Sequence, residues 1–361
     1  GSVVQPSGES ILAAVSRIAV VTSHPLFSAG GHLVIAKALV TALEEFGHEA
    51  TVVLTPQNRF GRQGAAYLST WLMDLGQAHD GRPVDQVISF RYPSYAVRHE
   101  RHVCWINHRM REYYDQWPRF SQSLSWRARA KERARRALIH AVDRYLLDDC
   151  VTQVYAQSHT IQARLARWGR LSAEVLHPPP PPRPYRCDRY GDYVLVASRL
   201  TPLKRVHLVL EALRLPPAKM VRCVIVGDGE SREWLTKLTK EYGLEGRVTF
   251  TGQVSEAELL EHLACCRAVC FPAIEEDYGL VTVEAFSSQK AVITCTDSGG
   301  PTELVRHETN GLVVESTANS LAVALARIFE DLTLAESFGV AGLQQVNTMT
   351  WERAVDRLTL V

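Results

Sequence analysis

A run of prolines near the middle of the chain constrains its fold more than any other feature. Pro178 to Pro182 and Pro184 stand in the segment HPPPPPRPY. Because proline has no N–H to donate and cannot continue a helix, the run favours an extended, polyproline-like connection. It therefore predicts a boundary between two folding units. The length of 361 residues agrees with two domains, since it exceeds what one core usually supports.

Short β-rich runs alternate with helical patterns on both sides of this boundary. The expected strands are 17–22, a run ending at Leu54, 86–90, 102–106 and 153–156, then 193–198, 221–227, 247–252, 267–272, 291–295 and 311–314. Such alternation is typical of parallel sheets flanked by helices. We therefore predict an α/β fold of two doubly wound, Rossmann-like domains whose strand-end loops face each other across a cleft.

The same pattern divides the chain into four expected segments. Residues 1–15 are predicted to be a disordered leader with a tag remnant, 16–183 the first domain and 184–346 the second. Residues 347–361 are predicted to form a terminal helix that crosses back to the first domain.

Composition excludes several classes of protein. The 40 basic and 39 acidic residues leave a formal charge of +1, which provides no general attraction for nucleic acid. The eight cysteines lack paired C-x2-C spacing, so we interpret them as reduced thiols and expect no metal site. No run approaches the ~20 apolar residues of a membrane span, and no signal peptide is recognisable. We expect a cytoplasmic protein.

One basic segment allows a second location. Residues 127–136, within WRARAKERARRALIHAV, predict a cationic amphipathic helix. Such a helix can lie on the anionic inner face of a membrane, although a solvated helix face explains the same pattern.

Two groups of residues in the second half could bind a long anionic ligand. FPAIEEDYGLVTVEAF places Glu276 in a loop, Tyr278, Gly279 and Leu280 at the start of a helix, and Glu284 about one turn further on. The free N–H groups of a helix start attract anions. Upstream, VASRLTPLKRVHL sets Arg199 and Lys204 after a strand, where two cations suit a diphosphate. Each group alone is also compatible with ordinary surface residues.

Together these pieces resemble the retaining GT-B glycosyltransferases of the large family four. The motifs occur in family order: R-L-x-x-x-K from Arg199 to Lys204, VGDG at 226–229, E-x7-E from Glu276 to Glu284, and DSGGPTE at 297–303. In the first half, FRYPSYAVRHERHVCWINHRMREYYD, AVDRYLL and AEVLHPPP resemble one bacterial branch, so the similarity extends over nearly the whole chain. Asn107, Arg109 and the pair Gln289-Lys290 depart from the family pattern.

The resemblance implies a role for each matching residue. Arg199 and Lys204 would contact the donor diphosphate, Glu284 the ribose hydroxyls and Glu276 the transferred sugar. The backbone of Tyr278, Gly279 and Leu280 would add donor contacts, and the base would lie near Gly252 and Val254. Gly30 and Gly31 would approach the diphosphate from the first domain, and His108 would reach the donor sugar. The expected catalytic set is therefore His108, Glu276, Arg199 and Lys204.

The resemblance also implies the reaction. A hexosyl group would pass from a nucleotide-diphosphate sugar, such as a UDP or GDP sugar, to an acceptor hydroxyl with retention of configuration. The leaving phosphate would take the acceptor proton on the same face, with neither a cofactor nor a metal; no D-x-D motif occurs. A nucleotide-sugar epimerase or hydrolase and a silent nucleotide-sugar-binding subunit remain open alternatives. A nicotinamide dehydrogenase is disfavoured because VGDGES lacks G-x-G-x-x-G.

Overall fold

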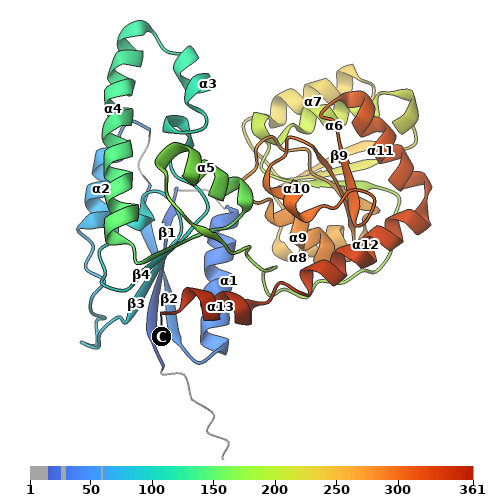
Figure 1. The fold of residues 1–361 in the computed structure, drawn as a ribbon. Coiled ribbons are helices and arrows are strands. Elements are labelled where there is room, and N and C mark those ends of the chain that lie inside the picture. The colour runs from blue at the N-terminus through green and yellow to red at the C-terminus, as the bar shows by residue number, and fades with distance from the viewer. Residues whose placement is uncertain (1–14, 26–29, 58–59, 361) are drawn as a thin grey trace, which may run out of the picture.

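A computed structural model describes residues 15–25, 30–57 and 60–360. In this part the chain forms two lobes, each built on a parallel six-stranded sheet flanked by helices (Figure 1). The α/β expectation is thereby confirmed. The leader predicted at the N-terminus lies, up to residue 14, outside the described residues.

The first lobe carries its sheet in the order β2-β1-β3-β4-β5-β6. Its strands are β1 (Arg17–His24), β2 (Glu49–Pro56), β3 (Gln86–Ser89), β4 (His102–Ile106), β5 (Gln153–Ala156) and β6 (Glu174–Val175). Its helices are α1 (Gly31–Glu45), α2 (Gln63–Trp71), α3 (Trp117–Gln122), α4 (Trp126–Arg144) and α5 (His159–Gly169).

The second lobe carries its sheet in the order β12-β11-β10-β7-β8-β9. Its strands are β7 (Val194–Ala197), β8 (Cys223–Val226), β9 (Val248–Gly252), β10 (Ala268–Cys270), β11 (Ala291–Cys295) and β12 (Gly311–Val314). Its helices are α6 (Val206–Leu213), α7 (Arg232–Glu241), α8 (Glu256–Cys265), α9 (Leu280–Ser287), α10 (Gly300–Leu304), α11 (Ala318–Glu330) and α12 (Leu332–Val346).

Burial explains why these runs form strands. Every residue of β4 and β11 is buried, as expected for parallel strands covered on both faces, whereas the edge strand β2 alternates toward solvent. Side-chain caps fix several helix starts. Ser158 caps α5, and Ser255 begins α8 with a reciprocal capping box to Glu258.

The last helix, α13 (Trp351–Leu358), packs on the first lobe rather than the second (Figure 1). Val355 and Leu358 are buried in the same apolar cluster as Leu39 and Trp105. The side-chain amide of Gln86 donates to the carbonyl of Leu358 at 2.6 Å. The chain thus passes between the lobes a second time. The exact segment boundaries at 183/184 and 346/347 stay predictions.

The proline-rich connection is held by hydrogen bonds from both lobes. Tyr278 Oη donates to the carbonyl of Pro178 at 2.6 Å, and Trp351 Nε1 donates to that of Pro180 at 2.8 Å. Lys290, one of the departures from the family pattern, is fully buried and donates to the carbonyl of Arg189 at 2.5 Å. The departure at Gln289-Lys290 therefore anchors the end of the connection.

Helices α3 and α4 project from the first lobe as a hairpin (Figure 1). None of the helices in the described ranges is both long and apolar enough to span a bilayer.

Candidate functional site

The order of the strands in the second sheet determines where the site lies. The topological switch point, where consecutive connections go to opposite sides, falls between β7 and β10. Arg199 follows β7 and Glu276 follows β10. In doubly wound sheets ligands bind outside the carboxyl ends of strands at such a point. The two sequence motifs therefore meet at the position that the topology favours for a ligand.

Lys204 and Glu276 form an ion pair at this point. Lys204 Nζ lies 2.5 Å from Glu276 Oε2, and both side chains are partly exposed. Nζ also lies 5.1 Å from the centre of the Phe271 ring. A cation and a carboxylate side by side can hold the two ends of a sugar phosphate, one contacting phosphate oxygens and the other sugar hydroxyls.

The loop that carries Glu276 is held tightly by the segment at 298–300. Glu276 N donates to the carbonyl of Ser298 at 2.8 Å, and Gly300 N donates to the carbonyl of Glu276 at 2.9 Å. Gly299 has φ of +75°, and a Cβ there would lie 2.6 Å from the carbonyl oxygen of Glu276. Glycine is required for this approach. The DSGGPTE motif therefore acts as the support of the Glu276 loop.

Helix α9 starts beside this loop with its first N–H groups uncapped by a side chain. Gly279 is the N-cap, has φ of +79°, and offers no capping group. Because the first N–H groups of a helix have no partner within the helix, they can donate to an anion. Leu280 begins the helix, while the side chain of Tyr278 is buried and turned to the connection at Pro178. Only the backbone of Tyr278 is available to a ligand.

A second helix start faces the first from the other lobe. Gly30 is the N-cap of α1 and likewise has no capping side chain. A Cβ on Gly31 would lie 3.7 Å from Leu280 Cδ2, and a Cβ on Gly30 would lie 3.8 Å from Arg199 Nη2. The starts of α1 and α9 therefore converge with Arg199 across the cleft. This convergence concentrates positive potential at one place.

His108 is half-buried and lies just after β4 in the first lobe. Its Nδ1 lies 2.7 Å from the carbonyl oxygen of Arg109. A carbonyl can only accept, so Nδ1 carries the proton and Nε2 presents a lone pair. Burial and the nearby Arg91 lower the pKa of His108 to about 3. The imidazole is therefore a neutral hydrogen-bond acceptor at physiological pH.

The two neighbours of His108 make contacts within the first lobe. Asn107 Oδ1 accepts from His108 N at 2.8 Å. Arg109 is buried, with its guanidinium carbon 3.8 Å from the centre of the Tyr114 ring. Neither departure from the family pattern therefore changes the chemistry presented by His108 itself.

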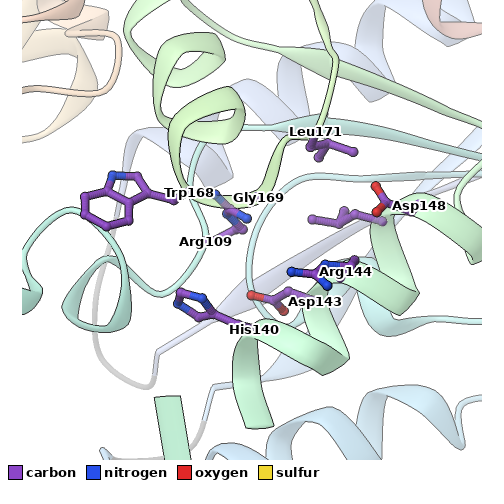
Figure 2. Close-up of a pocket in the computed structure, with 9 residues that line it drawn as sticks. Arg109, His140, Asp143, Arg144, Asp148, Trp168, Gly169 and Leu171 are labelled. Carbon is purple, nitrogen blue, oxygen red and sulfur yellow. The ribbon is translucent and has the colours of Figure 1, made fainter. Parts of the chain in front are cut away.

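Arg109 points into a small pocket inside the first lobe, between α4 and the end of α5. Figure 2 shows Arg109 beside Gly169, with His140 and Asp143 on α4. Asp143 is buried and accepts from the hydroxyls of Tyr95 at 2.7 Å and Tyr114 at 2.6 Å, and also from that of Tyr67. The tyrosine hydroxyls thus provide hydrogen-bond partners for the buried Asp143 carboxylate beside this pocket. These contacts stabilise the part of the first lobe that lies behind His108.

Glu284 does not line an open site in this structure. It is 6% exposed, and its carboxylate accepts a hydrogen bond from Arg183, in the connection between the lobes. Arg183 Nη2 also lies 2.8 Å from Glu256 Oε2 at the start of α8. Burial raises the pKa of Glu284 to about 7, although Arg183 opposes the shift. A ribose hydroxyl would have to replace this arginine.

Gly252 is the last residue of β9, and Val254 follows it at the same end of the second sheet. Gly252 has φ of +76°, and its carbonyl accepts from Gly227 N at 2.8 Å. Val254 is partly buried against an apolar cluster of this lobe. The structure thus places both near α8, whose Glu256 contacts Arg183.

Sequence reasoning missed a set of contacts that join the lobes at the site. Arg164 on α5 pairs with Asp277 and donates to the carbonyl of Glu275 at 2.6 Å, and Ser158 Oγ donates to the carbonyl of Asp277. Although burial raises the pKa of Asp277, Arg111, His108 and Arg164 hold it below the usual value. The only signal in the sequence was that Asp277 lies between two residues of the E-x7-E motif.

Glu303, the last residue of DSGGPTE, forms the second interlobe contact. Its carboxylate accepts from the backbone of His159 at 2.8 Å and of Thr160 at 2.7 Å, at the start of α5. His177 Nε2 lies 3.0 Å from the same carboxylate. These two histidines and Glu303 are close enough to suggest a metal site, but the helix start already uses the carboxylate oxygens.

Comparison with known proteins identifies the second lobe. Residues 188–345 match the family model described as glycosyl transferases group 1. The second lobe is therefore similar to this family over most of its length. A GDP-mannose-dependent phosphatidylinositol monomannoside mannosyltransferase of Mycobacterium tuberculosis is 34% identical over 44% of this chain and 43% of its own length. A D-inositol 3-phosphate glycosyltransferase of Nocardioides is 31% identical over 44% of this chain and 38% of its own. The matches thus span less than half the length of these relatives.

Solved structures establish the fold of the whole chain. Sucrose-phosphate synthase from Thermosynechococcus elongatus superposes with a TM-score of 0.74 at 18% identity, covering 95% of this chain and 97% of that one. WaaG, a glycosyltransferase involved in lipopolysaccharide biosynthesis, gives 0.69 at 16% identity, covering 95% and 99%. Anabaena HepE in complex with UDP and glucose gives 0.65 at 19% identity, covering 94% and 99%. The chain has the GT-B fold.

Proposed function

We propose that this chain is a glycosyltransferase that moves a sugar from a nucleotide-diphosphate donor to an acceptor hydroxyl. The Lys204–Glu276 pair carries the proposal, since it lies at the switch point of the second sheet and Glu276 stands in the loop that leads into α9. The similarity of the second lobe to the group 1 glycosyl transferases supports it.

The site favours departure of the nucleotide by charge stabilisation. Arg199, Lys204 and the α9 start would neutralise the growing charge on the leaving diphosphate. Glu276 would hold hydroxyls of the sugar, and His108 Nε2 would accept from another hydroxyl. We further propose retention of configuration, with the leaving phosphate taking the acceptor proton on the same face. No protein nucleophile, metal or cofactor is needed in this scheme.

The proposed donor is a UDP or GDP sugar. One similar structure holds UDP and glucose, and one relative is named as GDP-mannose-dependent. Ribose would contact Glu284 after it leaves Arg183, and the base would lie at Gly252 and Val254. A screen of donors by thermal shift tests this, because a bound donor raises the apparent stability by mass action.

Substitutions at the ion pair test the activity. We expect Lys204→Ala and Glu276→Ala each to lower transfer by at least about a hundredfold, as losses of transition-state charge stabilisation do. Product formation is measured by mass spectrometry, with exposed Lys219→Ala and Glu233→Ala as matched controls. Wild-type rates in both site variants, with unchanged melting, would refute the proposal.

Omitting the acceptor distinguishes the two alternatives. An epimerase or hydrolase converts the donor without an acceptor, whereas a silent binding subunit shows a thermal shift and no product under any condition. Formation of a product only with acceptor present supports the transferase.

A surface contact belongs to the same proposal. The basic residues 127–136 lie on the projecting α4, where Arg127, Lys131 and Arg133 are exposed. We propose that this helix brings a cytoplasmic enzyme to an anionic membrane surface that presents a lipid-linked acceptor.

A further inference from the structure

The first sheet has a switch point of its own, which the donor site leaves unexplained. In the order β2-β1-β3-β4-β5-β6, consecutive connections diverge between β1 and β3. The loop after β1 leads to Gly30 and α1, and Arg91 follows the end of β3. The rule that placed Arg199 and Glu276 therefore places Arg91 and the α1 start in the first-lobe wall of the cleft.

Arg91 is held in a fixed orientation. Its backbone N–H donates to Ser94 Oγ at 3.1 Å, and Ser94 Oγ donates back to its carbonyl at 2.6 Å. Arg91 Nη1 lies 3.1 Å from His32 Nδ1, and His32 Nε2 lies 3.0 Å from the carbonyl oxygen of Ser23. Since arginine only donates, His32 is the Nε2–H tautomer and orients the guanidinium.

One nitrogen of the Arg91 side chain is buried without a hydrogen-bond partner. Arg91 Nε is inaccessible to solvent and has no hydrogen-bond acceptor among the described residues. Leaving a charged donor unpaired in a buried place is costly, so such groups normally meet an anion. The unpaired Nε is the feature that points to a ligand.

Charged groups of both signs surround Arg91. Burial lowers its pKa to about 10 and Arg199 acts in the same direction, whereas Asp277 and Glu112 oppose the shift. Asp277 is already paired with Arg164 and lies 3.5 Å from Arg111 Nη1. Gly30 stands between His32 and Arg199, since a Cβ on it would lie 2.8 Å from the ring and 3.8 Å from the guanidinium. Cations from both lobes therefore come close together at the start of α1.

We propose that Arg91 and the N–H groups at the start of α1 bind a phosphate group in the cleft. The identity of that phosphate rests on the proposed function. It belongs either to the diphosphate of the donor or to a phosphorylated acceptor, and in both cases the first lobe supplies a charged contact. Arg91 is a binding residue for the proposed reaction to which the family resemblance assigns no role, although it lies in the family-like segment that begins FRYPSY.

Binding measurements on the full chain test this. Titration calorimetry compares wild type with Arg91→Gln and Arg91→Lys. The three probes are UDP, GDP and inorganic phosphate. Phosphate is titrated into the free protein and into protein already saturated with a nucleotide. Exposed Arg101→Gln is the matched control. Loss of one charged hydrogen-bond partner should weaken the affected phosphate about tenfold to a hundredfold, and Arg91→Lys should recover part of it.

The outcomes separate the two sources of phosphate. If Arg91→Gln binds UDP or GDP more weakly, and nucleotide-saturated wild type binds no phosphate, then Arg91 contacts the diphosphate of the donor. If nucleotide binding is unchanged, and nucleotide-saturated wild type binds phosphate while Arg91→Gln does not, then Arg91 contacts the phosphate of an acceptor. If wild type binds no nucleotide, the proposed function fails, and inorganic phosphate alone still tests Arg91.

A histidine titration separates ligand contact from misfolding. The pKa of His32 is lowered to about 3, and Arg91 contributes to this shift. NMR should therefore show a higher His32 pKa in a folded Arg91→Gln variant than in wild type. A folded variant with that shift and with wild-type binding of all three probes overturns the proposal.

Discussion

Donor binding should strengthen with pH because of Glu284. Its pKa of about 7 means that the carboxyl is mainly protonated at pH 6 and mainly ionised at pH 8. Ionised, it offers acceptor oxygens to the ribose hydroxyls in place of the hydrogen bond from Arg183. We therefore expect affinity for a nucleotide sugar to rise as pH increases through about 7.

The size of the effect follows from the fraction ionised. Roughly a tenth of Glu284 is ionised at pH 6 and roughly nine tenths at pH 8, so the dissociation constant should fall about tenfold, or about 1.4 kcal/mol. His32 and His108, with pKa values lowered to about 3 by burial, keep the same charge across this interval. They contribute nothing to the change.

Titration calorimetry between pH 5.5 and 8.5 measures this dependence. A nucleotide sugar is the right ligand, because its diphosphate has no terminal phosphate proton that titrates near pH 6. The comparison variant is Glu284→Gln, which should bind more weakly at pH 8 and show no such slope. A wild-type profile that is flat, or an equal slope in Glu284→Gln, would refute the reasoning.

Two further predictions concern the lobes and the surface. Glu303→Ala removes the acceptor at the start of α5, so small-angle scattering of the ligand-free protein should show a larger radius of gyration, whereas Glu308→Ala, at an exposed pair, should not. An unchanged radius in Glu303→Ala would show that this contact does not hold the lobes together. Wild type should float with phosphatidylglycerol vesicles and not with phosphatidylcholine ones, and Lys131→Glu/Arg133→Glu should lose most of this binding at about 1 kcal/mol per charge. Equal flotation of the double variant and wild type would show that these residues of α4 do not bind the membrane and only face solvent.

Local patterns in the sequence were sufficient for every described strand except the two-residue β6 and for the position of the motifs at the strand ends. The runs at 102–106, 153–156, 291–295 and 311–314 are strands with those bounds, because buried parallel strands appear as short apolar runs. Arg199, Lys204 and Glu276 could be grouped because strand-end loops converge at a switch point.

Contacts between the lobes could not be predicted in this way. The partners of Glu284 and Glu303 lie far away in the sequence, in the proline-rich connection and at the start of α5. Arg91 was likewise missed, since an arginine after a short strand resembles any surface cation until His32 and the unpaired Nε are seen. These contacts depend on pairing between distant residues and on burial. Neither produces a periodic pattern in the sequence from which the contacts could be predicted.

The position of α13 has a consequence for dissecting the protein. A fragment that ends at the proline-rich connection would leave the surface beneath Val355 and Leu358 bare, including part of the cluster around Trp105. Such a piece should aggregate when expressed alone. Soluble expression of the first lobe should require the last residues of the chain, joined by a linker or added as a separate peptide, so the lobe is continuous in space but not in sequence.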